Sequence, residues 1–255
     1  MNRRSVLTVL TSALVFSAVV RAQGFYVESI HAGNDKAMDR FYFMPKMLKT
    51  VDRDGRISIF RLDKETFYNI DPAKKSYTGM TFAEMKGMMG KAKSKLGDVL
   101  EKRLEQLPPD QRKKMEERMG AMMNQSTSPN VTYQVQATGE NKSISGYNCE
   151  KYIVKRNGKE FETIWATKQI GGFESIKRDM QDLTERLSSA IGTKGAINLW
   201  YKDIDGFPIQ TESYGSVSIA TKIERKTIPT SEFEVPAGYT KEKNKMEEAL
   251  NSGKD

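Results

Sequence analysis

The sequence contains very little cysteine and histidine: one of each, Cys149 and His31, in 255 residues. With one cysteine the chain cannot form an intramolecular disulfide, so its fold must depend on a hydrophobic core. With one histidine it cannot build a multi-histidine metal site, and Ser-His-Asp or Cys-His catalysis would have to use His31 itself. No pair of acidic residues indicates carboxylate catalysis. We therefore expect a protein that is not an enzyme and that uses no cofactor.

The chain also lacks an apolar run long enough to form a membrane-spanning helix. Its longest run, residues 6–20, has about 15 residues where a span needs about 20. This run follows Asn2-Arg3-Arg4 and precedes Val20-Arg21-Ala22, which is the layout of a secretory signal peptide. We expect cleavage after Ala22, by the general or the twin-arginine export route, and a mature protein in the periplasm.

The charge of the mature chain is only mildly positive. Removal of Arg3, Arg4 and Arg21 reduces the 41 basic residues to 38 against 33 acidic ones, a net charge of +5. The basic residues are spread in short groups without an aromatic-basic motif, so we expect no nucleic-acid partner. An anionic membrane surface is the partner that this charge would suit, and an ordinary solvated surface is the alternative.

Turn dipeptides and alternating side chains predict an antiparallel sheet. Asp54-Gly55, Asn157-Gly158 and Asp205-Gly206 each lie between strand-like runs, and such dipeptides accept the positive φ angles of tight hairpins. The predicted hairpins join 47–53 to 56–62, 152–156 to 159–166 and 197–204 to 207–213. Further strands are predicted at 25–32, 40–44, 67–70, 131–138 and 217–228. Cys149 lies in the strand-like run 147–154, where we expect it to be buried and inert.

Two helical regions interrupt the predicted strands. Thr81 and Glu84 form a capping-box pattern for a helix that starts at Phe82 and ends before Pro108-Pro109, where a second helix begins. Apolar residues at spacings of three and four, from Ile176 to Ile191, predict a later amphipathic helix that ends at Gly192. The charged residues 241–255 have little to bury and are expected to form a flexible tail.

The first helical region is unusually rich in methionine. Six of its methionines are candidate contacts for an apolar ligand: Met85, Met88, Met89, Met119, Met122 and Met123. Flexible thioether side chains adapt to variable apolar partners such as acyl chains. Ordinary core packing is the alternative, and copper binding is a third interpretation because thioethers are soft ligands. No histidines accompany the methionines, which counts against copper.

Five later segments carry a family resemblance. They are Gly146-Tyr147-Asn148-Cys149-Glu150-Lys151-Tyr152, Thr163-Ile164-Trp165-Ala166-Thr167, Asn198-Leu199-Trp200-Tyr201-Lys202, Asp205-Gly206-Phe207-Pro208-Ile209 and Phe233-Glu234-Val235-Pro236-Ala237-Gly238-Tyr239. In this order they resemble an uncharacterised family of exported bacterial proteins, a domain of unknown function. That family is itself similar to the periplasmic lipoprotein carriers of the LolA and LolB type. The resemblance covers roughly residues 25–239.

The resemblance implies an α+β fold. It implies a strongly curved antiparallel sheet, an incomplete β-barrel, with amphipathic helices packed on its concave side. In the carriers the space between sheet and helices holds lipid chains. This sequence departs from them by a Met-rich helical insertion, residues 82–124, which either plugs or lines that space. The expected organisation is a signal peptide over 1–22, one domain over 23–240 and the tail over 241–255.

These observations predict an exported, non-enzymatic envelope protein that binds an apolar ligand between its sheet and its helices. The ligand would be a lipid, an acyl chain or a lipidated protein. The alternative is a structural or protein-interaction module whose helices close onto the sheet.

Overall fold

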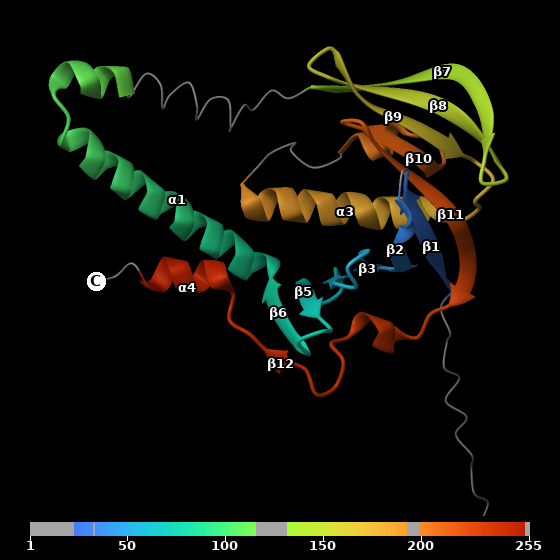
Figure 1. Ribbon diagram of the computed structural model, residues 1–255, viewed down its shortest axis with the longest axis horizontal. Coiled ribbons are helices and arrows are strands. Elements are labelled where there is room, and N and C mark those ends of the chain that lie inside the picture. Colours follow the sequence, from blue (N-terminus) through green and yellow to red (C-terminus); the bar gives the residue numbers. More distant parts are fainter. Residues whose placement is uncertain (1–22, 33, 116–131, 193–198, 253–255) are drawn as a thin grey trace, which may run out of the picture.

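The computed structural model describes residues 23–32, 34–115, 132–192 and 199–252 (Figure 1). The strands are β1 (Gln23–His31), β2 (Asn34–Met44), β3 (Met47–Val51), β4 (Ile57–Arg61), β5 (Thr66–Asp71), β6 (Ser76–Thr81), β7 (Tyr133–Ile144), β8 (Tyr147–Arg156), β9 (Lys159–Thr167), β10 (Phe207–Ser213), β11 (Ser216–Thr227) and β12 (Thr240–Lys241). The helices are α1 (Phe82–Glu105), α3 (Phe173–Ile191) and α4 (Lys245–Ser252), with 3-10 turns η1 (Leu199–Asp203) and η2 (Thr230–Phe233). Residues 109–115 are also helical, as the sequence predicts after Pro108.

The described strands form one 12-stranded sheet in the order β12-β6-β5-β4-β3-β2-β1-β11-β10-β9-β8-β7. Neighbouring strands run antiparallel except for β12, which pairs in parallel with β6. The sheet is open, with β12 and β7 at its two ends. Figure 1 shows strands β7–β9 on one side of α3 and strands β3, β5 and β6 on the other. The predicted α+β class with a mainly antiparallel sheet is therefore confirmed.

Two of the three predicted hairpins form at their turn dipeptides. Gly55, with φ +79°, lies in the turn between β3 and β4, whose strands pair antiparallel. Asn157 and Gly158, with φ 51° and 78°, connect β8 to β9. Consecutive left-handed residues match the right-handed twist of adjoining strands, which is why the sequence signal was reliable here.

The third hairpin prediction is wrong. The residues before Asp205-Gly206 that the structure describes form the 3-10 turn η1 and no strand, and β10 pairs with β9 and β11 instead. Gly206, with φ +114°, serves a close approach: a Cβ atom there would lie 2.4 Å from the carbonyl oxygen of Thr167 in β9. The glycine is thus explained by packing against a strand that is distant in sequence, which a local pattern does not record.

Both long helices form where the sequence predicts them. Thr81 and Glu84 make the reciprocal capping-box hydrogen bonds at the start of α1. Helix α3 ends at Gly192, whose φ of 74° allows the left-handed cap that closes a helix. Only the base of α1 is covered, since Phe82 and Met85 are its buried residues. The apolar side of α3 is buried against the sheet, so α3 is the helix that builds the core.

Side chains on both faces of the sheet are covered, each by a different part of the chain. On one face Leu48 and Leu62 pack with Phe82 and Leu183 from the two helices. On the opposite face of β2–β5, Met44, Ile59 and Ile70 pack with Ile228 and Phe233 from the chain that follows β11. The closing motif of residues 233–239 therefore forms the second core, with Phe233 fully buried.

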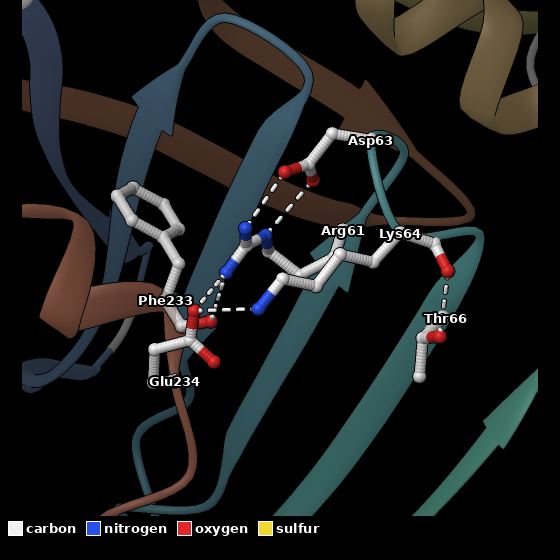
Figure 2. A network of polar contacts seen from close by, with 6 residues as sticks. All are labelled: Arg61, Asp63, Lys64, Thr66, Phe233 and Glu234. Carbon is white, nitrogen blue, oxygen red and sulfur yellow. Dashed lines mark hydrogen bonds and ion pairs between the residues drawn. The ribbon is translucent and has the colours of Figure 1, made fainter.

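A buried arginine fastens this closing segment to the sheet (Figure 2). Arg61, 5% exposed at the end of β4, donates two hydrogen bonds to Asp63, at 2.9 and 2.7 Å. It also donates to the Phe233 carbonyl at 3.3 Å and contacts the Glu234 carboxylate. The hydrogen bonds from Arg61 lower the pKa of Asp63. Burial alone would raise the pKa of Glu234, but hydrogen bonds from Lys64 and Arg61 outweigh it and lower that pKa.

Cys149 is completely buried, as the sequence predicts. Its exposed fraction is 0%, and it packs with Val27, Trp165 and Ile209. Burial raises the pKa of its thiol. The protonated thiol is a poor nucleophile, so Cys149 acts as a small apolar core residue.

The start of the charged segment 241–255 pairs with the edge of the sheet. Thr240 donates a backbone hydrogen bond to Lys75, at 2.9 Å, and Glu242 donates one to Tyr77, at 2.8 Å. These bonds form β12 on the edge of β6, and α4 follows. Backbone pairing at a sheet edge does not require apolar side chains, so a compositional argument could not detect it.

Candidate functional site

The main candidate site is an apolar cavity of about 420 Å³ between α3 and one face of the sheet. Its floor consists of side chains from β1, β2, β3, β4, β10 and β11, and its roof is α3. The apolar lining residues are Val27, Phe41, Phe43, Leu48, Phe60, Phe173, Met180, Leu183, Leu187, Phe207, Pro208, Ile209 and Ala220. Cavities of this size are in the range of small-molecule sites, whereas ordinary interiors rarely contain voids larger than a water molecule.

The floor is built by strand alternation and register. Side chains at every second position of a strand share a face, so Phe41 and Phe43 of β2 point to the same side. Phe41 lies opposite Val27 of β1, and Phe43 lies opposite Leu48 of β3. Leu48 in turn lies opposite Phe60 of β4. Four adjacent strands therefore contribute one continuous apolar surface.

The roof is held near its start and near its middle. Near the start of α3, the ring of Phe173 meets Phe207 of β10 edge to face, with centroids 4.8 Å apart. Further along, Leu183 is 4% exposed and packs in the cluster that contains Leu48. Aromatic edge-to-face contacts and buried aliphatic groups each stabilise this packing by about 1 kcal/mol or more. The cavity lies beneath α3 from Phe173 to Leu187.

Most polar groups in the lining already have partners. The hydroxyl groups of Ser29 and Ser218 lie 2.8 Å apart, and Thr184 donates to the Met180 carbonyl at 2.7 Å. Burial, together with the charge of Glu162 and a hydrogen bond to it, raises the pKa of Tyr201, so its phenol stays protonated. Gln181 and Thr211 add an amide and a further hydroxyl group. The lining thus combines a large apolar surface with a few uncharged polar groups and one lysine, Lys177.

The structure places the predicted methionine contacts elsewhere. Met85 is buried at the base of α1, and Met88 lines a separate groove between α1, β6 and the segment that leads into α4. Met89 is half-buried on α1. None of these three is among the residues that line the apolar cavity. Met119, Met122 and Met123 lie outside the described residues.

The residues of the cavity were visible in the sequence but had no functional signal. Met180, Leu183 and Leu187 belong to an amphipathic stripe, which is the ordinary pattern of a packed helix. Phe41 and Phe43 lie in the run Phe41-Tyr42-Phe43-Met44, whose side chains pack on both faces of the sheet, so the sequence does not mark one face as a ligand site. A separation between the two layers that leaves space for a ligand depends on the tertiary structure.

Metal binding and histidine chemistry have few candidate groups among the described residues. Within residues 23–32, 34–115, 132–192 and 199–252, no three His, Cys, Asp or Glu side chains are grouped as they would be around a metal ion. His31 is hydrogen-bonded to Asp39 at 2.8 Å. In the same described ranges, no helix is long and apolar enough to cross a bilayer.

Comparisons with known proteins identify a family. A family model described as "Domain of unknown function (DUF4412)" matches residues 81–239. Two crystal structures of PNGF-II, in space groups C2 and P21, match 91% and 90% of this chain at 10% identity, with TM-scores of 0.40 and 0.39. The chain spans 33% of the length of PNGF-II in each case. No curated protein matches the chain.

Proposed function

The chain belongs to the DUF4412 family, and we propose that it is an exported, non-enzymatic protein that binds an apolar ligand between α3 and its sheet. The single observation that carries this proposal is the cavity of about 420 Å³ with its continuous apolar floor and roof. Removal of apolar surface from water stabilises a complex by about 25 cal/mol per Å² of surface buried. A ligand that fills the space would therefore gain its affinity mainly from burial.

The architecture supports a carrier-like role for this cavity. A helix laid across an antiparallel sheet, with space for a ligand between the two layers, is the arrangement expected from the likeness to lipoprotein carriers. The signal-peptide pattern of residues 1–22 supports an envelope location. We therefore place the protein in the periplasm, where it would bind a lipid or acyl chain and shield it from water.

We predict that the protein purified from the periplasmic fraction begins at Gln23 and carries an apolar ligand. Intact-mass analysis would establish the first residue, and mass spectrometry of an organic extract would identify the ligand. The delipidated protein should bind N-phenyl-1-naphthylamine, an uncharged probe that fluoresces in apolar surroundings. Retention of residues 1–22 in the membrane fraction would contradict the location. A delipidated protein that fails to bind the probe would contradict the function.

Helix α1 has the features of a contact with an anionic lipid surface. Leu96 and Val99 are 60% and 61% exposed and lie three positions apart, so they share one side of the helix. Lys91, Lys93 and Lys95 lie within five residues before Leu96, and Asp98 is the single acidic residue in 85–100. Exposed apolar side chains with nearby lysines are typical of helices that lie on anionic membranes. We infer that α1 rests on such a surface when the protein collects or delivers its ligand.

For this contact we predict that the double variant Leu96→Ser/Val99→Ser binds phosphatidylglycerol vesicles about tenfold more weakly, since it loses two apolar groups from the interface. Vesicle co-sedimentation would measure the change. Gly97→Ser, which introduces a serine into the same turn where a side chain would meet no other atom within 4 Å, should bind as the wild type does. Equal binding to uncharged phosphatidylcholine vesicles would argue against the role of the lysines.

A further inference from the structure

The apolar cavity contains one charged side chain among the described residues that line it, Lys177 of α3. This side chain is only 13% exposed. Its Nζ atom donates a hydrogen bond to the Ile204 carbonyl oxygen at 2.6 Å. The neighbouring carboxylate, from Glu174, lies 4.0 Å away and is itself 67% exposed. A largely buried lysine side chain is therefore located at the wall of an apolar space.

The charge of Lys177 is incompletely neutralised by the protein. An ammonium group has three donors, and the structure gives it one hydrogen bond and one long ion pair with an exposed partner. Exposed ion pairs contribute little, whereas a charge removed from water is costly unless it is paired. An anionic group placed in the cavity beside Nζ would supply the missing partner and would be screened little by salt.

The surrounding groups favour a polar head at this position. Gln181 lies one helical turn after Lys177 and also lines the cavity, and so does Tyr201 of η1, the segment that leads to Ile204. No aspartate or glutamate is among the described residues that line the cavity. Phe41, Phe43 and Phe60 contribute only apolar contacts to the lining. The lining thus combines one positive charge and its polar neighbours with a large apolar surface.

We propose that the ligand is a single-chain amphiphile whose anionic head group, a carboxylate or a phosphate, binds Lys177 while its chain lies against the phenylalanines. This inference rests on the proposed apolar-ligand function and names the class of ligand. A cavity of about 420 Å³ is in the size range of small-molecule sites, which a single-chain amphiphile matches.

The test measures displacement of N-phenyl-1-naphthylamine from the delipidated protein by dodecanoate, dodecyl phosphate and dodecanol. In the wild type, one or both anions should displace the probe at a lower concentration than the alcohol. In Lys177→Gln the preferred anion should lose about tenfold in affinity, the value of a charge-assisted hydrogen bond, while the alcohol and the probe are unaffected. Lys177→Arg should restore the preference. Arg178→Gln, the same charge change at an exposed position one residue along α3, is the matched control and should bind as the wild type does.

The outcomes separate this inference from the function on which it rests. If the probe binds but Lys177→Gln keeps the wild-type ratio of anion to alcohol affinity, the head-group assignment is wrong and apolar binding stands. If neither protein binds the probe, both proposals are wrong. Whichever anion binds more tightly in the wild type identifies the head group. Probe affinity and melting temperature measured on each variant show that a loss of anion binding does not come from unfolding.

Discussion

Ala220→Phe should abolish binding of N-phenyl-1-naphthylamine and of any co-purifying ligand. Ala220 lies on β11, is 5% exposed and lines the cavity, so a benzyl group added there would occupy the space between sheet and helix. Replacing a small residue with a larger one in a close-packed core usually lowers the free energy of unfolding by about 1–3 kcal/mol. Here the cavity accepts the added ring, so the free energy of unfolding should change by less than about 1.5 kcal/mol. Loss of binding without loss of stability would identify the cavity as the ligand site.

The matched control is Ala137→Phe, which makes the same change at an exposed position of strand β7. It should leave probe binding unchanged, because Ala137 is not among the residues that line the cavity. Fluorescence titration and thermal unfolding of both variants complete the comparison. Normal probe affinity in folded Ala220→Phe would show that the ligand binds elsewhere, and the groove beside Met88 would be the next site to examine.

Phe233→Ala should lower the free energy of unfolding by about 3–5 kcal/mol, the range measured for large aromatic residues removed from cores. Phe233 is fully buried and fills the centre of the cluster formed by Met44, Ile59, Ile70 and Ile228. Its backbone carbonyl also accepts a hydrogen bond from Arg61. Loss of the ring would leave a cavity and loosen the segment that covers this face of the sheet.

Denaturant unfolding would measure this effect. Tyr214→Ala, which removes an aromatic ring that is 83% exposed, should cost less than about 1 kcal/mol and serves as the control. Because Phe233 lies on the face opposite the cavity, the folded Phe233→Ala variant should still bind the apolar probe. A small change in stability would mean that the closing motif of residues 233–239 contributes little to the core.

Features that depend on neighbouring residues could be predicted from the sequence. The capping box of Thr81 and Glu84, the turn at Asn157-Gly158 and the left-handed cap at Gly192 each require particular residue types within a few positions. Burial of Cys149 followed from its place in an apolar strand. The segment patterns from Gly146 to Tyr239 were sufficient for the family, which the family match confirms.

Features that join distant segments required the tertiary structure. The sequence predicts a hairpin at Gly206, but the glycine serves a close approach to Thr167 that depends on the pairing of β9 with β10. The methionine content of α1 predicts a ligand site on that helix. The helix that covers the cavity is instead α3, whose apolar stripe is the ordinary pattern of a packed helix. The cavity depends on the separation between α3 and the sheet. The charge of Lys177 is relevant to a ligand only because that separation places the side chain beside an apolar space. The sequence determined which residues turn toward the core, and the packing of α3 on the sheet decided where that core leaves space for a ligand.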